Sequence, residues 1–317
     1  MTSKLRICFI FIAIICVSNC WRHSHFGKCK CTFQNENCWG LSIRIAIFSW
    51  NMVSRAMSFS FEENSQARTT IIAILSAVFL MGASSALQGT SVALRGGMEG
   101  FSEQVIGLIM SGYFIGFIVG SLIVVNFIRF VGYVRTFAAF ASLASTMSLA
   151  HLIVIHPVAW IIFRSLHGLF LSGMLVIIES WLNSSTSTYN RGRVLGLYSL
   201  VYLTAMGAGQ PLIGVFSPAT FEIFAVTSIL VSLSLVPLAL AQVTGTPRVD
   251  HSPIQIARTF AKSPMAGFGV LLSGMSAEAM WSLAPLYGHG QGLSEGAIGN
   301  LMLFLSLGAL ASQWPLG

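Results

Sequence analysis

From Thr70 onward the chain alternates between long apolar blocks and short polar loops. Each block has about 20 residues, the length that an α-helix needs to cross a hydrocarbon layer about 30 Å thick. Backbone polar groups inside lipid must be paired within their own segment, so helices are the structures that these blocks favour. The expected fold class is therefore an all-α, multi-pass transmembrane helical bundle. The blocks predict eight helices, at residues 70–94, 104–127, 136–155, 158–180, 194–216, 220–241, 266–287 and 296–316.

The basic residues of the loops lie almost entirely on one side of this expected bundle. Eight of them precede the first helix or follow the second, fourth and sixth helices, whereas the opposite loops hold only Arg95. Positively charged loops stay on the cytoplasmic side of a membrane, so the residues before Thr70 are expected to be cytoplasmic. The eight residues are Arg68, Arg129, Arg135, Arg191, Arg193, Arg248, Arg258 and Lys262.

The composition excludes a soluble globular protein. Apolar residues make up 55% of the chain and charged residues only 9%, whereas soluble domains carry about 25% charge. The formal net charge of +7 would suggest a nucleic-acid partner in a soluble protein. Between long apolar runs the same surplus reports membrane orientation, so the expected partner is the lipid bilayer and not nucleic acid.

All six cysteines lie within the first 38 residues. Cys29 and Cys31, with His23 and His25 nearby, could be taken for a metal cluster. A Cys-x-Cys beside a His-x-His matches none of the spaced zinc patterns, however. The sequence therefore predicts no metal site and no cofactor.

A short apolar run at residues 7–17 follows two basic residues and resembles a secretory signal. Its 11 residues are too few to span a bilayer. A signal here would carry the residues before Thr70 outward, against the charge pattern of the loops. We therefore interpret residues 1–56 as a non-native upstream extension or an unstructured segment, with the native start at Met57 or Met52.

The sequence contains an internal repeat with a period of 192 residues. Gly96–Ser121 aligns with Gly288–Gln313, with eight of 26 positions identical, so the first two helices recur as the seventh and eighth in the same orientation. Parallel repeats of this kind build transporters. The repeat predicts a six-helix bundle at 57–241, a cytoplasmic linker at 242–265 and, at 266–317, the first two helices of an incomplete C-terminal bundle. We therefore expect the chain to be C-terminally truncated.

Four features in chain order resemble the major facilitator superfamily. They are the basic loop at 120–135, Arg164–Gly168 followed by Gly173, the helix-five entry Asn190–Gly196, and the glycine–proline stretch Gly207–Gly214. Glu179–Asn183 together with Arg191–Arg193 is similar to a poorly characterised bacterial inner-membrane branch of that family. The resemblance implies two six-helix bundles that rock about a midplane site, in the inner membrane.

The resemblance also implies roles for two groups of residues. Arg129, Gly132 and Arg135 lie in the loop that gates the cytoplasmic side in this family, although an Asp usually occupies the position of Arg129. Gly209 and Pro211 belong to the helix-five motif that accompanies exporters, so export is slightly favoured. In this chain Pro211 also invites a kink, because proline cannot donate a backbone hydrogen bond.

Three ionisable residues inside expected helices are candidates for a functional role, because a charge there is costly and usually faces an interior path. Arg164 and His167 are three residues apart and so project from nearly one helix face, where they could hold an anionic solute group. Glu278 could carry a proton if it lines a central cavity. The structural alternatives stay open: an arginine satisfied by carbonyls, a packed histidine, and a permanently paired glutamate.

Four further positions predict ligand contact or packing. Gln88 and Trp281 occupy nearly equivalent positions of the repeat and would suit a mixed polar and apolar solute, or alternatively helix packing. Glu179 favours a salt link to the loop that contains Arg191 and Arg193. A stripe of glycines in the second helix predicts close helix packing at a surface that slides; these are Gly112, Gly116 and Gly120.

Neither a hydrolase serine motif nor a nucleotide-binding loop occurs in the sequence, so we do not expect an enzyme. The sequence and the resemblance together predict a secondary active transporter of a small organic solute, working by alternating access with proton coupling. The alternative is a transporter-like membrane protein that moves no solute and acts as a sensor or scaffold.

Overall fold

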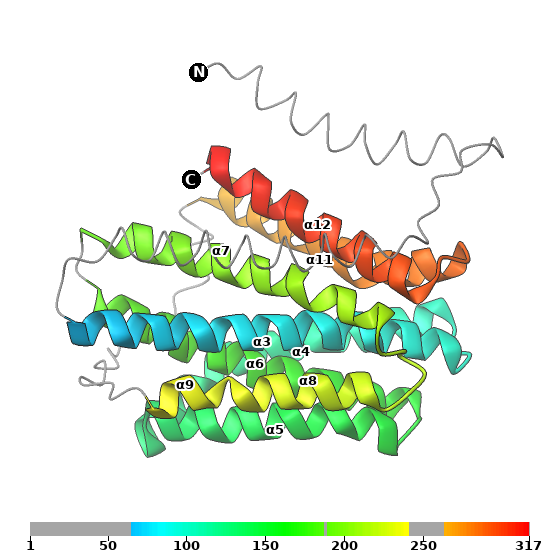
Figure 1. Cartoon of the computed structure of the whole chain (residues 1–317), viewed down its shortest axis with the longest axis horizontal. Coiled ribbons are helices and arrows are strands. Elements are labelled where there is room, and N and C mark those ends of the chain that lie inside the picture. The colour runs from blue at the N-terminus through cyan, green and yellow to red at the C-terminus, as the bar shows by residue number, and fades with distance from the viewer. Residues whose placement is uncertain (1–64, 187–188, 241–262, 317) are drawn as a thin grey trace.

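The computed structural model describes residues 65–186, 189–240 and 263–316, and within these ranges the chain forms helices that lie side by side, without strands (Figure 1). The expected extension at 1–56 and most of the linker at 242–265 lie outside the described residues. The helices are α3 Ser65–Met98, α4 Glu103–Val131, α5 Tyr133–Ile153, α6 Pro157–Ser185, α7 Arg191–Gly209, the 3-10 helix η1 Gln210–Gly214, α8 Glu222–Leu233, α9 Leu235–Leu240, α11 Pro264–Gly290 and α12 Glu295–Leu316.

Six helical segments among the described residues are long and apolar enough to cross a membrane. The remaining two expected spans are also helical, as α7 and α11, but they carry more small and polar side chains. Large apolar side chains also cover the outside of the bundle, among them Phe130 at 88% exposure and Ile153 at 81%. Lipid is the environment in which such a surface is stable, so the chain is a multi-pass membrane protein, and its predicted all-α class is confirmed.

Two of the expected spans are interrupted near a proline. The span predicted at 194–216 ends its α-helix at Gly209 and continues as η1, which contains Pro211. The span predicted at 220–241 is divided at Ser234 into α8 and α9, three residues before Pro237. A proline has no N–H to donate to the preceding turn, which favours a break at each of these two places.

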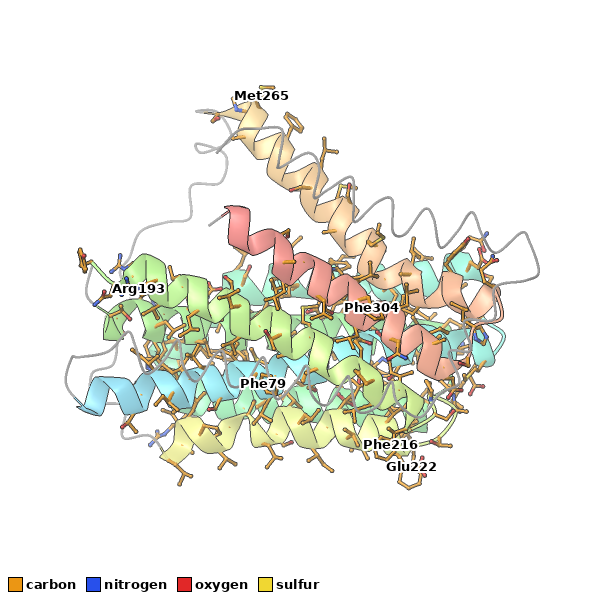
Figure 2. All side chains as sticks on the ribbon, turned by 45° about the horizontal axis from the view of Figure 1, so that its top comes forward. Phe79, Arg193, Phe216, Glu222, Met265 and Phe304 are labelled. Atoms are coloured by element: carbon orange, nitrogen blue, oxygen red, sulfur yellow. The ribbon has the colours of Figure 1, made fainter. Side chains whose placement is uncertain are left out.

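The bundle has two apolar cores, one toward each end. The end that contains Arg95, Ser217 and Glu295 is called the Arg95 end below, and the opposite end, which contains Arg193 and Met265, the Arg193 end (Figure 2). The core toward the Arg193 end contains buried residues of α3 to α9 only, within the described ranges.

The core toward the Arg95 end also includes the later helices. Ile298 of α12 is fully buried in it, and Leu286 of α11 packs against it. Toward the Arg193 end α11 diverges from the bundle, and its side chains Met265 and Phe268 are exposed (Figure 2). The first six spans and the last two helices are therefore held together mainly at the Arg95 end.

The repeated sequence forms the same kind of turn at two places in the structure. Gly100 and Gly292 have nearly equal positive φ angles, 77° and 74°, a conformation that glycine adopts without strain. Ser102 and Ser294 each accept a hydrogen bond from a backbone N–H three residues later, at 3.4 Å in both cases. The turns that lead into α4 and α12 are thus capped in the same way.

The packing around these turns is also repeated. A Cβ atom on Gly96 would lie 3.2 Å from Cγ1 of Ile106, and a Cβ on Gly288 would lie 3.2 Å from Cγ1 of Ile298. The identical glycines and isoleucines therefore keep neighbouring helices in contact at equivalent positions.

Candidate functional site

The glycine stripe of α4 places α6 within backbone contact. A Cβ on Gly116 would lie 1.7 Å from the carbonyl oxygen of Ser165, and one on Gly120 would lie 2.1 Å from that of Leu169. Gly112 faces the carbonyl of Ile161 in the same way, at 3.0 Å. Small residues allow such a close approach between membrane helices. Here the approach fixes the position of Ser165 and its neighbours in α6 relative to α4.

Arg164 lies inside the bundle, where α6 meets α4 and α3. Its side chain is only 3% exposed, and its Cζ atom lies 4.7 Å from the centroid of the Tyr113 ring of α4, a cation–π contact. On the α3 side its Nη2 atom is 3.9 Å from the position of a Cβ on Gly89. Gly89 and the guanidinium group therefore lie next to each other, at an ordinary van der Waals distance.

Two histidines are buried near this arginine. His167 is fully buried, and its ring lies 6.3 Å from the Tyr113 ring. His151 of α5 is 1% exposed, with Nδ1 2.7 Å from the carbonyl oxygen of Met147 and its ring edge-on to Trp160. His151 is not among the candidates predicted above, although it is an ionisable residue inside an expected span and so meets the same criterion as Arg164.

A second group of buried polar side chains connects α3 with η1 and α8. The Thr227 hydroxyl donates to Oε1 of Gln88 at 2.9 Å, and the Ser84 hydroxyl donates to the carbonyl oxygen of Thr227 at 2.7 Å. The Thr90 hydroxyl donates to Oε1 of Gln210 at 3.0 Å. Of these residues only Gln88 is a ligand candidate predicted from the sequence, because threonine and serine pair readily within helices and give no pattern of their own.

The amide nitrogens of Gln88 and Gln210 have no hydrogen-bond partner within the described residues, although both side chains are buried. A buried donor without an acceptor is destabilising, so such groups usually have a water or ligand nearby or serve a functional role. The interior of the bundle therefore offers amide donors close to the α3 helix.

Two of the predicted candidates, Glu278 and Trp281, lie on α11. Glu278 lies within α11, but its side chain is outside the described part of the structure. Trp281 is half-buried in the same helix. Neither residue has a described contact with Arg164 or Gln88, so their roles stay predictions.

The expected salt link of Glu179 was wrong. Within the described residues its carboxylate forms no ion pair with Arg191 or Arg193; instead, the Tyr198 hydroxyl donates to its Oε1 at 3.1 Å. The two arginines lie in the first turn of α7 with exposed side chains, where water solvates them. Here α6 and α7 are thus joined by a hydrogen bond from a neutral hydroxyl group to a carboxylate, and not by an ion pair.

The expected gating loop lies at the Arg193 end. Arg129 is in the last turn of α4, Gly132 forms the junction with φ 85°, and Arg135 is in the first turn of α5. The backbone N–H of Gly132 donates to the carbonyl of Ile128 at 2.8 Å, which closes α4. Both arginine side chains are exposed at this end.

The helix-five motif lies between α3 and α12. A Cβ on Gly209 would be 2.8 Å from the carbonyl oxygen of Ala83 in α3. On the other side, a Cβ on Gly299 of α12 would be 2.6 Å from the carbonyl oxygen of Gln210. The junction of α7 and η1, next to Pro211, is therefore in close backbone contact with both helices.

In the described ranges, no three His, Cys, Asp or Glu side chains are grouped closely enough to hold a metal ion. The six cysteines are not part of these ranges.

Comparison with known proteins gives a family match over most of the chain. The sequence profile of the Major Facilitator Superfamily matches residues 45–317. A protein of Yersinia pestis (strain Pestoides F) named as an uncharacterized MFS-type transporter is 28% identical over 249 residues, which cover 78% of this chain and 65% of that protein. The uncharacterized MFS-type transporter YcaD of Escherichia coli O6:K15:H31 is 28% identical over 252 residues, with the same coverage. The chain thus spans 65% of the length of these curated relatives.

Proposed function

The chain belongs to the Major Facilitator Superfamily, and from this premise we propose that it acts as a secondary active transporter, which moves a small organic solute by alternating access. The observation that carries the proposal is the buried polar interior of a membrane-embedded bundle. Arg164 and Gln88 are almost completely enclosed by apolar helices there.

The energetics support a functional role for Arg164. An arginine near the centre of a membrane helix costs about 2.5–3.5 kcal/mol on insertion scales, so a protein retains one where it lines a path or binds a ligand. The guanidinium group adjoins Gly89 and can present planar, bidentate donors to a carboxylate or phosphate. We propose that Arg164 binds an anionic group of the solute and that Gln88, His167 and Trp281 complete the path.

The position of the helices supports alternating access. The last two helices contact the bundle mainly at the Arg95 end and diverge at the Arg193 end. The loop charges favour a cytoplasmic position for the Arg193 end. The arrangement then corresponds to a state that is closed outside and open inside, in the inner membrane.

Three finer assignments follow the family pattern. The loop with Arg129, Gly132 and Arg135 would gate the cytoplasmic side, since it lies where the helices diverge. Glu278 would carry the coupled proton. The motif with Gly209 and Pro211 supports export as the direction of transport.

Transport by the full-length protein in proteoliposomes tests the proposal. A panel of organic solutes is offered with and without a pH gradient, and gradient-driven accumulation is expected for at least one anionic solute. The Arg164→Gln variant should lose this accumulation, Arg164→Lys should retain part of it, and Arg193→Gln, which changes an exposed arginine, should transport normally.

Variants of Glu278 separate coupling from movement. Glu278→Gln should abolish accumulation driven by the pH gradient and preserve solute exchange. A protein that moves no member of the panel, with Arg164 and Glu278 intact, would instead support the sensor or scaffold alternative.

A further inference from the structure

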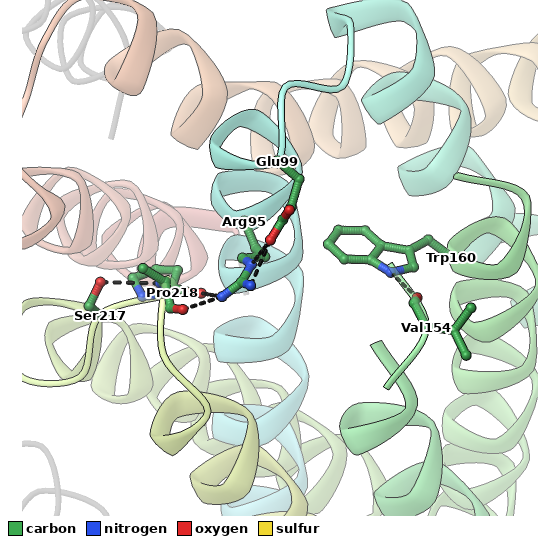
Figure 3. Close-up of polar contacts among 7 residues, drawn as sticks. Arg95, Glu99, Val154, Trp160, Ser217 and Pro218 are labelled. Carbon is green, nitrogen blue, oxygen red and sulfur yellow. Dashed lines mark hydrogen bonds and ion pairs between the residues drawn. The ribbon is translucent and has the colours of Figure 1, made fainter. Parts of the chain in front are cut away.

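Arg95 is the exception to the charge pattern of the loops, and the structure shows what it contacts. Its guanidinium group pairs with Glu99 one turn later, with Nε and Nη2 both 2.6 Å from Oε1 (Figure 3). The same group donates from Nη1 to the carbonyl oxygen of Pro218 at 3.3 Å and to that of Ala219. The end of α3 is thus bound to the loop between η1 and α8.

That loop is in turn bound to α12. The Ser217 hydroxyl donates to Oε1 of Glu295 at 2.9 Å, and the backbone N–H of Ala219 donates to the Ser217 oxygen at 3.2 Å. Glu295 is the first residue of α12. A continuous polar chain therefore runs from Glu99 through Arg95 and the loop to the first turn of α12.

The packing beneath this polar chain is close. A Cβ on Gly296 of α12 would lie 3.6 Å from the Cα atom of Gly214, at the end of η1. Next to Arg95 on α3, a Cβ on Gly97 would lie 3.5 Å from the His289 ring of α11. Contacts between the two repeat units thus gather at the end where the polar chain lies.

We propose that Arg95, Glu99, Ser217 and Glu295 form an outer latch, a set of side chains that holds the transporter closed at the Arg95 end and must separate for that end to open. This inference rests on the proposed alternating access. The bond between Ser217 and Glu295 is its link between the repeat units, and Arg95 holds the loop that presents Ser217.

The chemistry explains why an arginine occurs on this side of the membrane. Two loop carbonyls and one carboxylate converge on Arg95, and a guanidinium group can donate to all three at once. Lysine has a single ammonium group on a flexible stem and lacks this planar geometry. The latch thus gives Arg95 a role that overrides the preference for basic residues on the cytoplasmic side.

Accessibility of an introduced cysteine tests the latch without a solute. Ser85 is half-buried on α3, one turn from Gly89 and on the same helix face, so Ser85→Cys reports whether the face of α3 next to Arg164 is open to the outside. Intact cells that express the full-length protein are treated with a membrane-impermeant thiol reagent. Matched variants without Ser85→Cys correct for labelling of the native cysteines.

The latch variants should label faster than the parent. Loss of hydrogen bonds to charged groups shifts a two-state equilibrium by about tenfold or more, so Arg95→Gln should raise the labelling rate of Ser85→Cys by about that factor. Ser217→Ala should raise it less, because it leaves the contacts of Arg95 with the loop in place. Glu295→Gln should leave the rate near that of the parent, since a glutamine oxygen can still accept from Ser217.

Arg193→Gln is the control, because it removes an exposed arginine from the opposite end, and its labelling rate should be unchanged. Equal rates for the parent and Ser217→Ala, with Arg95→Gln also unchanged, would overturn the latch. If Arg95→Gln does not accumulate in the membrane, Ser217→Ala alone decides. Because labelling needs no solute, these outcomes are independent of the transport assay, and a protein that moves no tested solute could still show the latch.

Discussion

At the scale of single residues, the glycines of α4 show how little space separates α4 from α6. Gly116 meets a backbone carbonyl of α6, and backbone atoms cannot move aside as a flexible side chain can. Gly107, in the same helix, has no atom within 4 Å of its Cβ position. The two glycines differ in surroundings alone, so they form a matched pair for substitution.

Gly116→Ala should therefore destabilise the protein, because the added methyl group forces α4 and α6 apart. Overpacking of a well-packed contact costs about 1–3 kcal/mol, and backbone overlap places this site at the upper end. Thermal unfolding in detergent measures the effect as a lower melting temperature. Gly107→Ala should melt within a degree or so of the parent or slightly higher, since alanine favours helix; equal melting temperatures for both variants would contradict the close contact.

At the scale of elements, the connection between α4 and α5 depends on one residue. Gly132 has φ 85° and ψ 171°, a backbone region that is essentially restricted to glycine. With this single residue the chain reverses direction between two membrane helices. The expected gating loop is thus short because of its glycine, and it is charged because of its arginines.

Gly132→Ala should strain this connection, at a cost of about 1–3 kcal/mol. Because the loop lies where the repeat units diverge, we expect both a lower melting temperature and slower transport. Gly192→Ala is the matched control, since Gly192 lies in the first turn of α7 with no atom within 4 Å of its Cβ position. A normal melting temperature for Gly132→Ala would show that the loop adopts another conformation.

At the scale of the whole molecule, the bundle has two ends with different surroundings. Tyr189 is 94% exposed in the connection before α7, at the Arg193 end, and Phe221 is 65% exposed just before α8, at the Arg95 end. The charge pattern of the loops predicts that the first end is cytoplasmic. These two exposed residues therefore report the orientation of the protein.

An impermeant thiol reagent added to intact cells should label Phe221→Cys and leave Tyr189→Cys unlabelled. After the cells are permeabilised both variants should react, which shows that Tyr189→Cys is exposed. The opposite result, with labelling at position 189 only, would reverse the orientation, and both the inward-open assignment and the outer position of the latch would fail with it.

Much of the fold could be predicted from the sequence, because its determinants are local. The number of residues in an apolar block decides whether a helix can cross lipid, and Pro211 already predicts the kink where the span at 194–216 changes to a 3-10 helix. The repeat aligns Gly100 with Gly292, and in the structure the two glycines have nearly equal positive φ angles, since identical glycines and caps favour the same backbone. Burial of Arg164 and His167 likewise followed from their positions within an apolar block.

Only the tertiary structure decided which side chains meet. The partner of Glu179 is a tyrosine and not an arginine, and Gln88 is joined to Thr227, 139 residues away in the sequence. The chain of contacts from Arg95 to Glu295 likewise joins residues from three elements. Hydrophobic length and proline act within one segment and so can be read along the chain, whereas these contacts depend on how helices rotate and approach one another in space.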